Sequence, residues 1–384
     1  MANRLLRERR EKALLTQEEL AEKVGAHEIS VRRWEAGNRP QAHYVRRLCE
    51  ALEASPPELG FLVDGDGRPY SPAVIPRAFG ALGLDPDDEA DIEEIEAATL
   101  RLRRSYSTTR PAELLARLDE RLRQVRRMLS RNRRGPIQRS LIRHAAWLSL
   151  LRATVQADLR RFESAASSVF AARQLAREAG DREAEAWTWE TDAWLAATDG
   201  RQLDARELAS AGMAVAPAGT HGLVAVTLQR ARINGALGDE AAAVRDLLAG
   251  EQALAAAGPV HHQDDHYEID PAKAAFFASG AMAALHRPAE TIEHAAEVVR
   301  ASEDHRSRNY WPMRVANARL EWAMALVDQG EEDEAAALAR VVLSEPRWFR
   351  PDTERRARML LDRMRDPRLR ADNASLLEER LEQG

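Results

Sequence analysis

The stretch TQEELAEKVGAHEISVRRWEAGNRP, residues 16–40, decides how the N-terminal part of the chain folds. Thr16 suits the position just before a helix, and Glu19, three residues later, completes a capping box. The apolar residues that follow fall on one helical face: Leu20, Ala21 and Val24. Gly25 then interrupts the pattern. The sequence therefore predicts a short helix that begins after Thr16 and ends at this glycine.

A second helix is predicted from about His27 to Ala36. Val31 and Trp34, three residues apart, form its buried side. Its outer face then carries His27, Glu28, Ile29, Arg32 and Arg33. The end of the helix is marked by Gly37, Asn38 and Pro40. Two short helices joined by a glycine turn, the second with a polar and basic outer face, predict a helix-turn-helix that places its second helix in the DNA major groove.

The T-Q-x-E-L-A opening, the glycine turn, Ser30 and the W-E-x-G-x-x-P ending resemble the XRE family, the Cro and phage-repressor type of helix-turn-helix. The resemblance covers about residues 3–62 and implies a five-helix lambda-repressor-like domain. It implies that Gln17 hydrogen-bonds a DNA phosphate and that Arg10 pairs with Glu35. It also implies base-edge contacts from the outer face of the second helix: His27, Glu28, Ile29, Arg32 and Arg33.

Two features qualify this resemblance. Phage repressors often carry Gln where this chain has Glu28 and Ile29, and because Glu accepts from cytosine N4 while Ile contacts a thymine methyl, we expect a different base preference. Residues 1–62 hold 11 Lys and Arg against 10 Asp and Glu. Phosphate binding would therefore depend on a local arginine cluster: Arg4, Arg7, Arg32, Arg33 and Arg39. The alternative is a helical hairpin with no role in DNA binding.

Composition limits the other classes of protein. A chain of 384 residues is long enough for two or three domains. It has no apolar run near 18 residues, so we expect no membrane span. Its charged N-terminus, from Arg4 onward, predicts no secretory signal. The single cysteine, Cys49, excludes an internal disulfide framework and a cysteine-based zinc site, which suits a cytoplasmic protein.

The organisation changes after residue 62. Residues 63–76 are dense in Gly, Pro and Asp and predict an interdomain linker, which we extend to residue 84. Residues 85–104 begin acidic and end basic, as suits a helix dipole. Residues 112–131 carry leucines at helical spacing. We therefore expect an all-α chain with a DNA-binding domain at 1–62 and a helical domain at 85–384.

From residue 140 onward the chain repeats itself. Turn-like elements recur at steps of 40, 38, 48 and 44 residues: Arg160, Gly200, Gly238, His286 and Gly330. Five residues after each lies a small residue: Ala165, Ala205, Ala243, Thr291 and Ala335. Seven residues before each lies another: Ala153, Ala193, Ala231, Ser279 and Ala323. Each unit is predicted to be a helix pair whose small residues let the two backbones approach closely.

This pattern resembles the tetratricopeptide repeat (TPR), whose units place small residues twelve apart on helices A and B. The units are longer than usual and most Trp and Tyr positions are absent, so we expect a TPR-like α-solenoid. A helix-turn-helix followed by such repeats is similar to bacterial regulators, including the quorum-sensing group that binds short peptides. It is also similar to a large set of actinomycete XRE-family regulators.

The TPR register implies that certain residues of the first helices face an inner groove: Trp147, Thr154, Trp187, Trp194, Arg232, Lys273, Phe276 and Asn317. Three tryptophans beside Arg232 and Lys273 could hold an apolar ligand, or a peptide with an acidic end. The alternative is that the tryptophans fill the core between repeats, since large aromatic residues are mostly buried.

The loop VHHQDDHYEIDP, residues 260–271, contains metal-ligand residue types. It lacks a rigid helical histidine pair, so we expect a solvated loop between repeats and no metal. The sequence has no phosphate-binding glycine loop, nucleophile elbow or paired His/Cys arrangement. We therefore expect neither a cofactor nor enzymatic activity.

These expectations combine into one function: an all-α transcription regulator that binds duplex operator DNA, as a homodimer because one such domain covers few base pairs. Its repeat domain would bind a small molecule, peptide or protein partner. One alternative is a TPR-type interaction adaptor with little or no DNA binding. Another is a metal-dependent enzyme that uses the histidine-rich loop.

Overall fold

The computed structural model of the protein describes residues 3–38, 40, 42–54, 59–61, 86–130, 135–304, 310–345 and 350–382. Within these ranges the chain forms 18 α-helices and no β-strand, which confirms the all-α prediction. It divides into two compact units, Met1–Thr99 with Asn132–Leu141 and Leu100–Arg131 with Ile142–Gly384. The division falls within two helices, at 99/100 and at 141/142, whereas the sequence places the start of the helical domain at residue 85.

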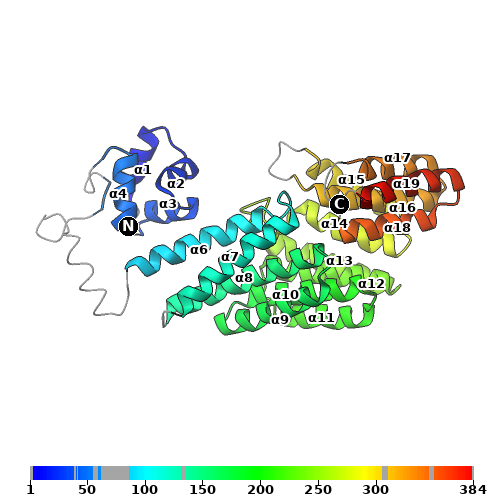
Figure 1. Ribbon diagram of the computed structural model, residues 1–384, viewed down its shortest axis with the longest axis horizontal. Helices are drawn as coiled ribbons and strands as arrows, with labels where there is room; N and C mark the ends of the chain where they lie inside the picture. The colour runs from blue at the N-terminus through cyan, green and yellow to red at the C-terminus, as the bar shows by residue number, and fades with distance from the viewer. Residues whose placement is uncertain are drawn as a thin grey trace, which may run out of the picture. The chain divides into compact units, whose positions relative to one another are not determined.

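The N-terminal domain contains four described helices: α1 (Arg4–Lys12), α2 (Gln17–Val24), α3 (Glu28–Glu35) and α4 (Ala42–Ala51) (Figure 1). Thr16 and Glu19 form the expected reciprocal capping box at the start of α2. Gly25 ends α2 at a φ of 69°, a left-handed conformation that favours glycine. The predicted fifth helix at 55–60 and the linker at 63–84 lie, wholly or largely, outside the described residues.

The small core of this domain joins all four helices. It contains the apolar residues of α2 and α3 that the sequence placed inside, together with residues of α1 and α4: Leu6, Leu20, Ala21, Val24, Val31, Trp34, Tyr44 and Leu48. The ring of Trp34 lies 5.0 Å from that of Tyr44. Because Val31 and Trp34 anchor α3 in this core, the opposite face of the helix is fixed toward solvent.

The rest of the described chain is a series of helix pairs. A first pair, α6 (Pro86–Arg104) and α7 (Pro111–Leu129), precedes the repeats. The repeats are α8 (Pro136–Asp158) with α9 (Phe162–Ala179), α10 (Arg182–Thr198) with α11 (Gln202–Val215), α12 (His221–Ala236) with α13 (Glu240–Ala256), α14 (Pro271–Ala284) with α15 (Pro288–Ser302), and α16 (Pro312–Gln329) with α17 (Glu332–Leu343). A final pair, α18 (Pro351–Arg363) and α19 (Pro367–Glu382), follows.

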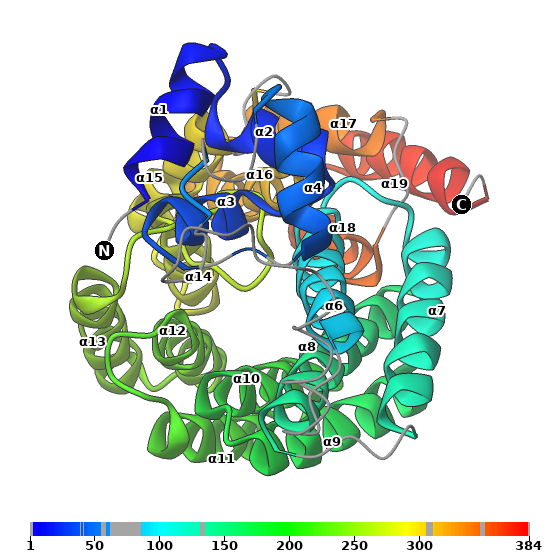
Figure 2. The same cartoon turned by 90° about the vertical axis from the view of Figure 1, so that its left-hand side faces the viewer.

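The first helices of successive pairs pack on one another, α10 on α12, α12 on α14, α14 on α16 and α16 on α18. Figure 2 shows that the pairs follow a curve, with these first helices on its inner side and α9, α11 and α13 on its outer side. The array is therefore an α-solenoid with a concave inner face, as the repeat spacing predicts.

The turns that set the repeat register are confirmed as turns. All five have a positive φ: Arg160 (59°), Gly200 (81°), Gly238 (73°), His286 (55°) and Gly330 (89°). Each connects the two helices of one pair. Arg160 and His286 adopt a conformation that side chains rarely favour, so the repeat imposes its turn even where glycine is absent.

The ten small residues flanking these turns are all buried. Each has an exposed fraction of 0%: Ala153, Ala165, Ala193, Ala205, Ala231, Ala243, Ser279, Thr291, Ala323 and Ala335. A larger side chain at such a position would collide with the facing helix. The predicted close approach of paired helices is therefore confirmed.

The array also joins segments that are far apart in the sequence. Arg350, just before α18, forms an ion pair with Asp158 at the end of α8. Arg103 and Arg104 of α6 pair with Asp265 and Asp264 at 2.9 Å each. The early and late parts of the array are thus held together by buried and half-buried charges.

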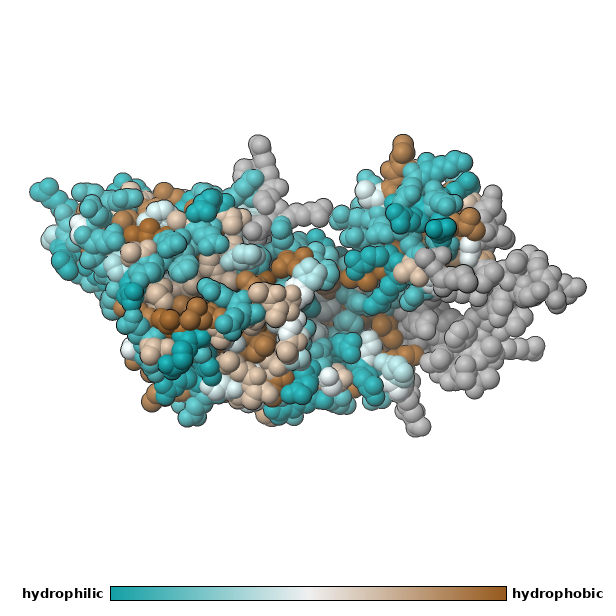
Figure 3. Space-filling model, turned by 180° about the vertical axis from the view of Figure 1, so that it is seen from behind, coloured by the Kyte–Doolittle hydropathy of each residue, from teal (hydrophilic) through white to brown (hydrophobic). Residues whose placement is uncertain are grey.

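The outer surface is mixed in character. In Figure 3, apolar residues form small patches that hydrophilic residues separate. None of the helices in the described ranges is long and apolar enough to cross a membrane.

Candidate functional site

The candidate DNA-reading surface is the outer face of α3. Val31 and Trp34 have exposed fractions of 0% and 3%, whereas Arg32 and Arg33 are exposed. Arginine at such a surface can contact phosphates or donate two hydrogen bonds to a guanine edge. The helix therefore presents its cations away from the core that holds it.

His27, Glu28 and Ile29 occupy the start of this helix. His27 is the residue before α3, and its Nδ1 accepts a hydrogen bond from the Ile29 N–H at 3.1 Å. Its imidazole therefore caps the helix, which differs from the helical position that the sequence predicts. Glu28 and Ile29 lie in the first turn and are half-buried. Arg39, the remaining predicted DNA contact, lies outside the described residues.

A buried network fixes α3 against α1 and α2. Arg10 pairs with Glu35 as the resemblance implies, with Nε to Oε1 at 2.6 Å and Nη2 to Oε2 at 3.2 Å. The Gln17 amide Nε2 donates to Glu35 Oε2 at 2.7 Å. The amide has a second N–H, so Gln17 retains a donor for a phosphate while Glu35 fixes its orientation.

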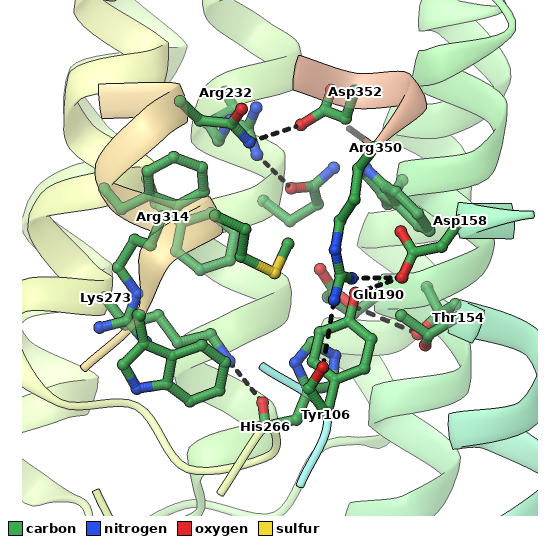
Figure 4. A pocket seen from close by; sticks show the side chains of 18 of the residues that line it. Tyr106, Thr154, Asp158, Glu190, Arg232, His266, Lys273, Arg314, Arg350 and Asp352 are labelled. Atoms are coloured by element: carbon green, nitrogen blue, oxygen red, sulfur yellow. Dashed lines mark hydrogen bonds and ion pairs between the residues drawn. The ribbon is translucent and has the colours of Figure 1, made fainter. Parts of the chain in front are cut away.

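The second candidate site is a pocket on the inner side of the repeat array (Figure 4). Its apolar walls are aromatic and include Trp187, Trp194, Phe276, Phe277 and Trp311. Its charged residues come from several helices and loops: Asp158, Glu190, Arg232, Lys273, Arg314, Arg350 and Asp352. The pocket therefore combines aromatic walls with several charged side chains.

The structure brings together most of the predicted groove residues. The pocket is lined by Thr154, Trp187, Trp194, Arg232, Lys273, Phe276 and Asn317. Trp187 is also part of the interior, with an exposed fraction of 1%, whereas Trp194 is half-buried. The two readings of these tryptophans, as groove or as core, therefore both apply to Trp187.

Trp147 does not line the pocket, and its prediction as a groove residue needs correction. Its ring packs edge-on against Tyr267, with 5.0 Å between centroids, and beneath the Arg103 guanidinium at 4.4 Å. Its indole N–H donates to Asp181 at 3.0 Å. The loop at 260–271 supplies Tyr267, and this aromatic ring covers the side of α8 that would otherwise face inward.

That loop is not the solvated segment that the sequence predicts. His266 packs against Tyr106 at 4.2 Å between ring centroids and lines the pocket. Burial, the largest effect, together with cations that include Lys273, holds the pKa of His266 well below its usual value. Within the described ranges, no group of three or more His, Cys, Asp or Glu residues is arranged to hold a metal.

Sequence reasoning missed several lining residues. Glu190 lies between Trp187 and Trp194 on α10, so helical spacing alone could have identified it. Tyr106 and Arg350 come from segments outside the repeats, and no local pattern marks them. Arg350 reaches the pocket because it pairs with Asp158, and its Nη2 also donates to the Tyr106 carbonyl at 3.1 Å.

The N-terminal part of the chain is similar to a known domain family. A family model described as a helix-turn-helix domain matches residues 4–62. No curated protein matches the chain. Among solved structures, the crystal structure of Bacillus thuringiensis PlcR in complex with the peptide PapR7 and DNA is similar at a TM-score of 0.33 and 12% identity, covering 98% of this chain and 99% of that chain. Residues 4–62 are a helix-turn-helix domain.

Proposed function

We propose that the protein is a transcription regulator of the XRE type that reads duplex DNA with α3 and responds to a ligand in the pocket of its repeat array. The observation that carries the DNA-binding half is the placement of Arg32 and Arg33. Both are exposed on a helix whose opposite face is buried, within a domain that matches a helix-turn-helix family model. In this arrangement the second motif helix enters the major groove.

The low net charge of the domain shapes how it would bind. With 11 basic against 10 acidic residues in 1–62, long-range attraction to DNA is weak. Affinity must then come from contacts formed at close range, and the glutamine at the start of α2 supports this. Gln17 is oriented by Glu35 and keeps one amide N–H for a phosphate.

Binding as a homodimer follows from the size of the reading surface. Helix α3 spans eight residues, so one domain contacts only a few base pairs. Two domains on half-sites about 34 Å apart would double the number of contacts, as in other helix-turn-helix proteins.

The sensing half rests on the pocket. Its lining residues come from α8, α10, α12, α14, α16 and α18 and from the segments before α7, α14, α16 and α18. A ligand that contacts all of these elements would change their relative positions, which shifts the equilibrium between conformations of the array. DNA binding would respond to the ligand if these conformations hold the two DNA-binding domains of a dimer differently.

The proposal is tested by selecting bound duplexes from a random-sequence library with the full chain. We expect enrichment of one motif with two-fold symmetry, and failure to enrich any motif would refute sequence-specific binding. Gln17→Ala should weaken binding to every duplex by a similar factor, because a phosphate contact carries no sequence information. A change in the selected motif would instead place Gln17 at a base.

A further inference from the structure

Four cations line the pocket, and two of them are already neutralised. Arg314 pairs with Asp270, with Nη1 to Oδ1 at 3.2 Å. Arg350 pairs with Asp158. Both pairs are almost fully buried, so these cations serve the structure of the walls.

Lys273 differs from these arginines. Its exposed fraction is 8%, and its Nζ donates to the His266 carbonyl at 2.5 Å and lies 5.0 Å from the centroid of the Trp187 ring. No carboxylate of the described residues forms an ion pair with it. Burial, the largest effect, and the charge of Arg314 lower the pKa of Lys273, and the charges of Glu190, Asp270 and Asp265 only partly oppose them. Two of its three N–H donors remain available.

Arg232 is in the same situation. Its Nη1 makes a long hydrogen bond of 3.5 Å to Gln229, and its guanidinium lies over the rings of Phe276 at 5.5 Å and Phe277 at 5.7 Å. Across the described part of the chain, no carboxylate pairs with it. Burial lowers the pKa of Arg232 to about 10.

The acids of the pocket do not balance these two cations. Asp352 is engaged by Asn317 at 3.2 Å, by Arg355 at 2.9 Å and by Arg356. Only Glu190 remains, and its hydrogen bond is a weak one from the Thr191 hydroxyl at 3.4 Å. Burial raises the pKa of Glu190, although the charges of Lys273 and Arg232 oppose this effect. Two cations therefore face at most one carboxylate, whose charged form burial disfavours.

Both cations lie over aromatic rings of the pocket. On α14, Lys273 lies one helical turn before Phe276 and Phe277. Arg232 of α12 lies over the same two rings. Trp187 and Trp194 form the α10 side of the pocket. In Figure 4, Lys273 extends toward His266 and Arg232 lies near Asp352, so the two cations lie toward different ends of the pocket.

We propose that this pocket binds a compact amphipathic anion, with a flat apolar body against the Trp and Phe rings and a carboxylate or sulfonate held by Lys273 or by Arg232. The inference rests on the proposed function, because it names the chemical class of ligand for the same pocket. An anion there supplies the counter-ion that the two buried cations lack. Planar arginine and the ammonium group both favour such oxygen acceptors.

The test uses two fluorescent probes that share one ring skeleton. 1-Anilinonaphthalene-8-sulfonate carries a negative charge, and N-phenyl-1-naphthylamine lacks the sulfonate. With the full chain, we expect at least one of the variants Lys273→Met and Arg232→Met to lower the affinity for the sulfonate at least fivefold. The affinity for the neutral probe should stay within twofold, because the apolar walls are unchanged.

Glu190→Gln is the matched control, since it alters a polar residue of the same pocket without removing a cation. It should keep or raise the affinity for the sulfonate, because it removes a competing negative charge. Indole-3-acetate should displace the bound sulfonate at lower concentration than indole-3-acetamide does. Thermal unfolding of each variant shows that the array is folded, and a methionine variant that does not fold is replaced by Lys273→Gln or Arg232→Gln.

The outcomes separate the inference from the function on which it rests. Equal losses for both probes, an unchanged affinity for the sulfonate, or a loss in Glu190→Gln as large as in the cation variants would overturn the anion inference. If only the neutral probe binds, the pocket accepts ligands but not anions, and the sensing proposal stands without this inference. If neither probe binds, the anion inference fails, whereas the sensing half of the proposed function, which names no ligand class, is unaffected.

Discussion

The ion pair between Asp158 and Arg350 should contribute strongly to the stability of the repeat array. The side chains are 5% and 3% exposed and lie 192 residues apart in the sequence. Tyr106 completes the cluster, because its hydroxyl donates to Asp158 Oδ2 at 3.0 Å and its carbonyl accepts from Arg350. Replacing Asp158 by Asn leaves the guanidinium buried without a counter-ion.

The magnitude follows from burial and distance. Opposite charges within about 4 Å attract by about 4 kcal/mol at an effective dielectric constant of 20. Removing one partner of a buried pair costs about 3–5 kcal/mol, whereas replacing both is often close to neutral. We therefore expect Asp158→Asn to lower the free energy of unfolding of the array by about 3–5 kcal/mol. The double variant Asp158→Asn with Arg350→Met should be more stable than Asp158→Asn alone.

The assay is guanidinium-induced unfolding of the full chain, followed by far-UV circular dichroism, for the wild type, both single variants and the double variant. The coupling free energy from this cycle should be at least about 2 kcal/mol. Single-variant losses below about 1 kcal/mol that add within about 0.5 kcal/mol would show that the two ends of the array are not joined by this pair.

Three further predictions concern the array. Ala231→Leu should cost about 1–3 kcal/mol in unfolding free energy, because the residue is fully buried between paired helices, and no loss would count against the close packing. Trp187→Ala should cost about 3–5 kcal/mol and Trp194→Ala clearly less, since only the first is fully buried; equal melting temperatures would contradict this order. Burial, with nearby Arg143 and Arg103, lowers the pKa of His144 from 6.5 to about 4. The unfolded chain therefore binds the proton more tightly than the folded chain, so the free energy of unfolding falls as the pH drops below about 6.5. Between pH 7.5 and 5 this loss is about 2 kcal/mol, and urea unfolding of His144→Gln should lack it; an identical pH dependence in both proteins would refute the assignment.

Much of the fold could be predicted because its determinants are local. Thr16 with Glu19 specifies the start of α2, and the positions of Val31 and Trp34 specify which face of α3 is buried. The repeat turns are predicted from turn-like elements flanked by small residues, even where the residue is not glycine, as at His286. Capping, helical periodicity and turn conformation act over a few residues, so sequence alone exposes them.

The pocket could be predicted only in part. Residues seven apart on one helix, such as Trp187 and Trp194, follow from periodicity, and the structure places both in the pocket wall. Trp147 obeys the same pattern but is covered by Tyr267, which arrives from a loop 120 residues later. Arg350 likewise depends on closure of the array. Contacts of this kind are set by tertiary packing, which no local pattern encodes.

The central claim, that α3 reads DNA sequence, is tested most directly by a ratio of two affinities. Affinities of the full chain for the selected duplex and for a scrambled duplex of equal length are measured at one physiological salt concentration. The wild-type ratio should reach at least about 10³. In the double variant Arg32→Ala with Arg33→Ala, the affinity ratio should fall below about tenfold. Its melting temperature should be unchanged, because both side chains are exposed. A wild-type ratio near one, or a ratio that survives the double substitution, would contradict the account.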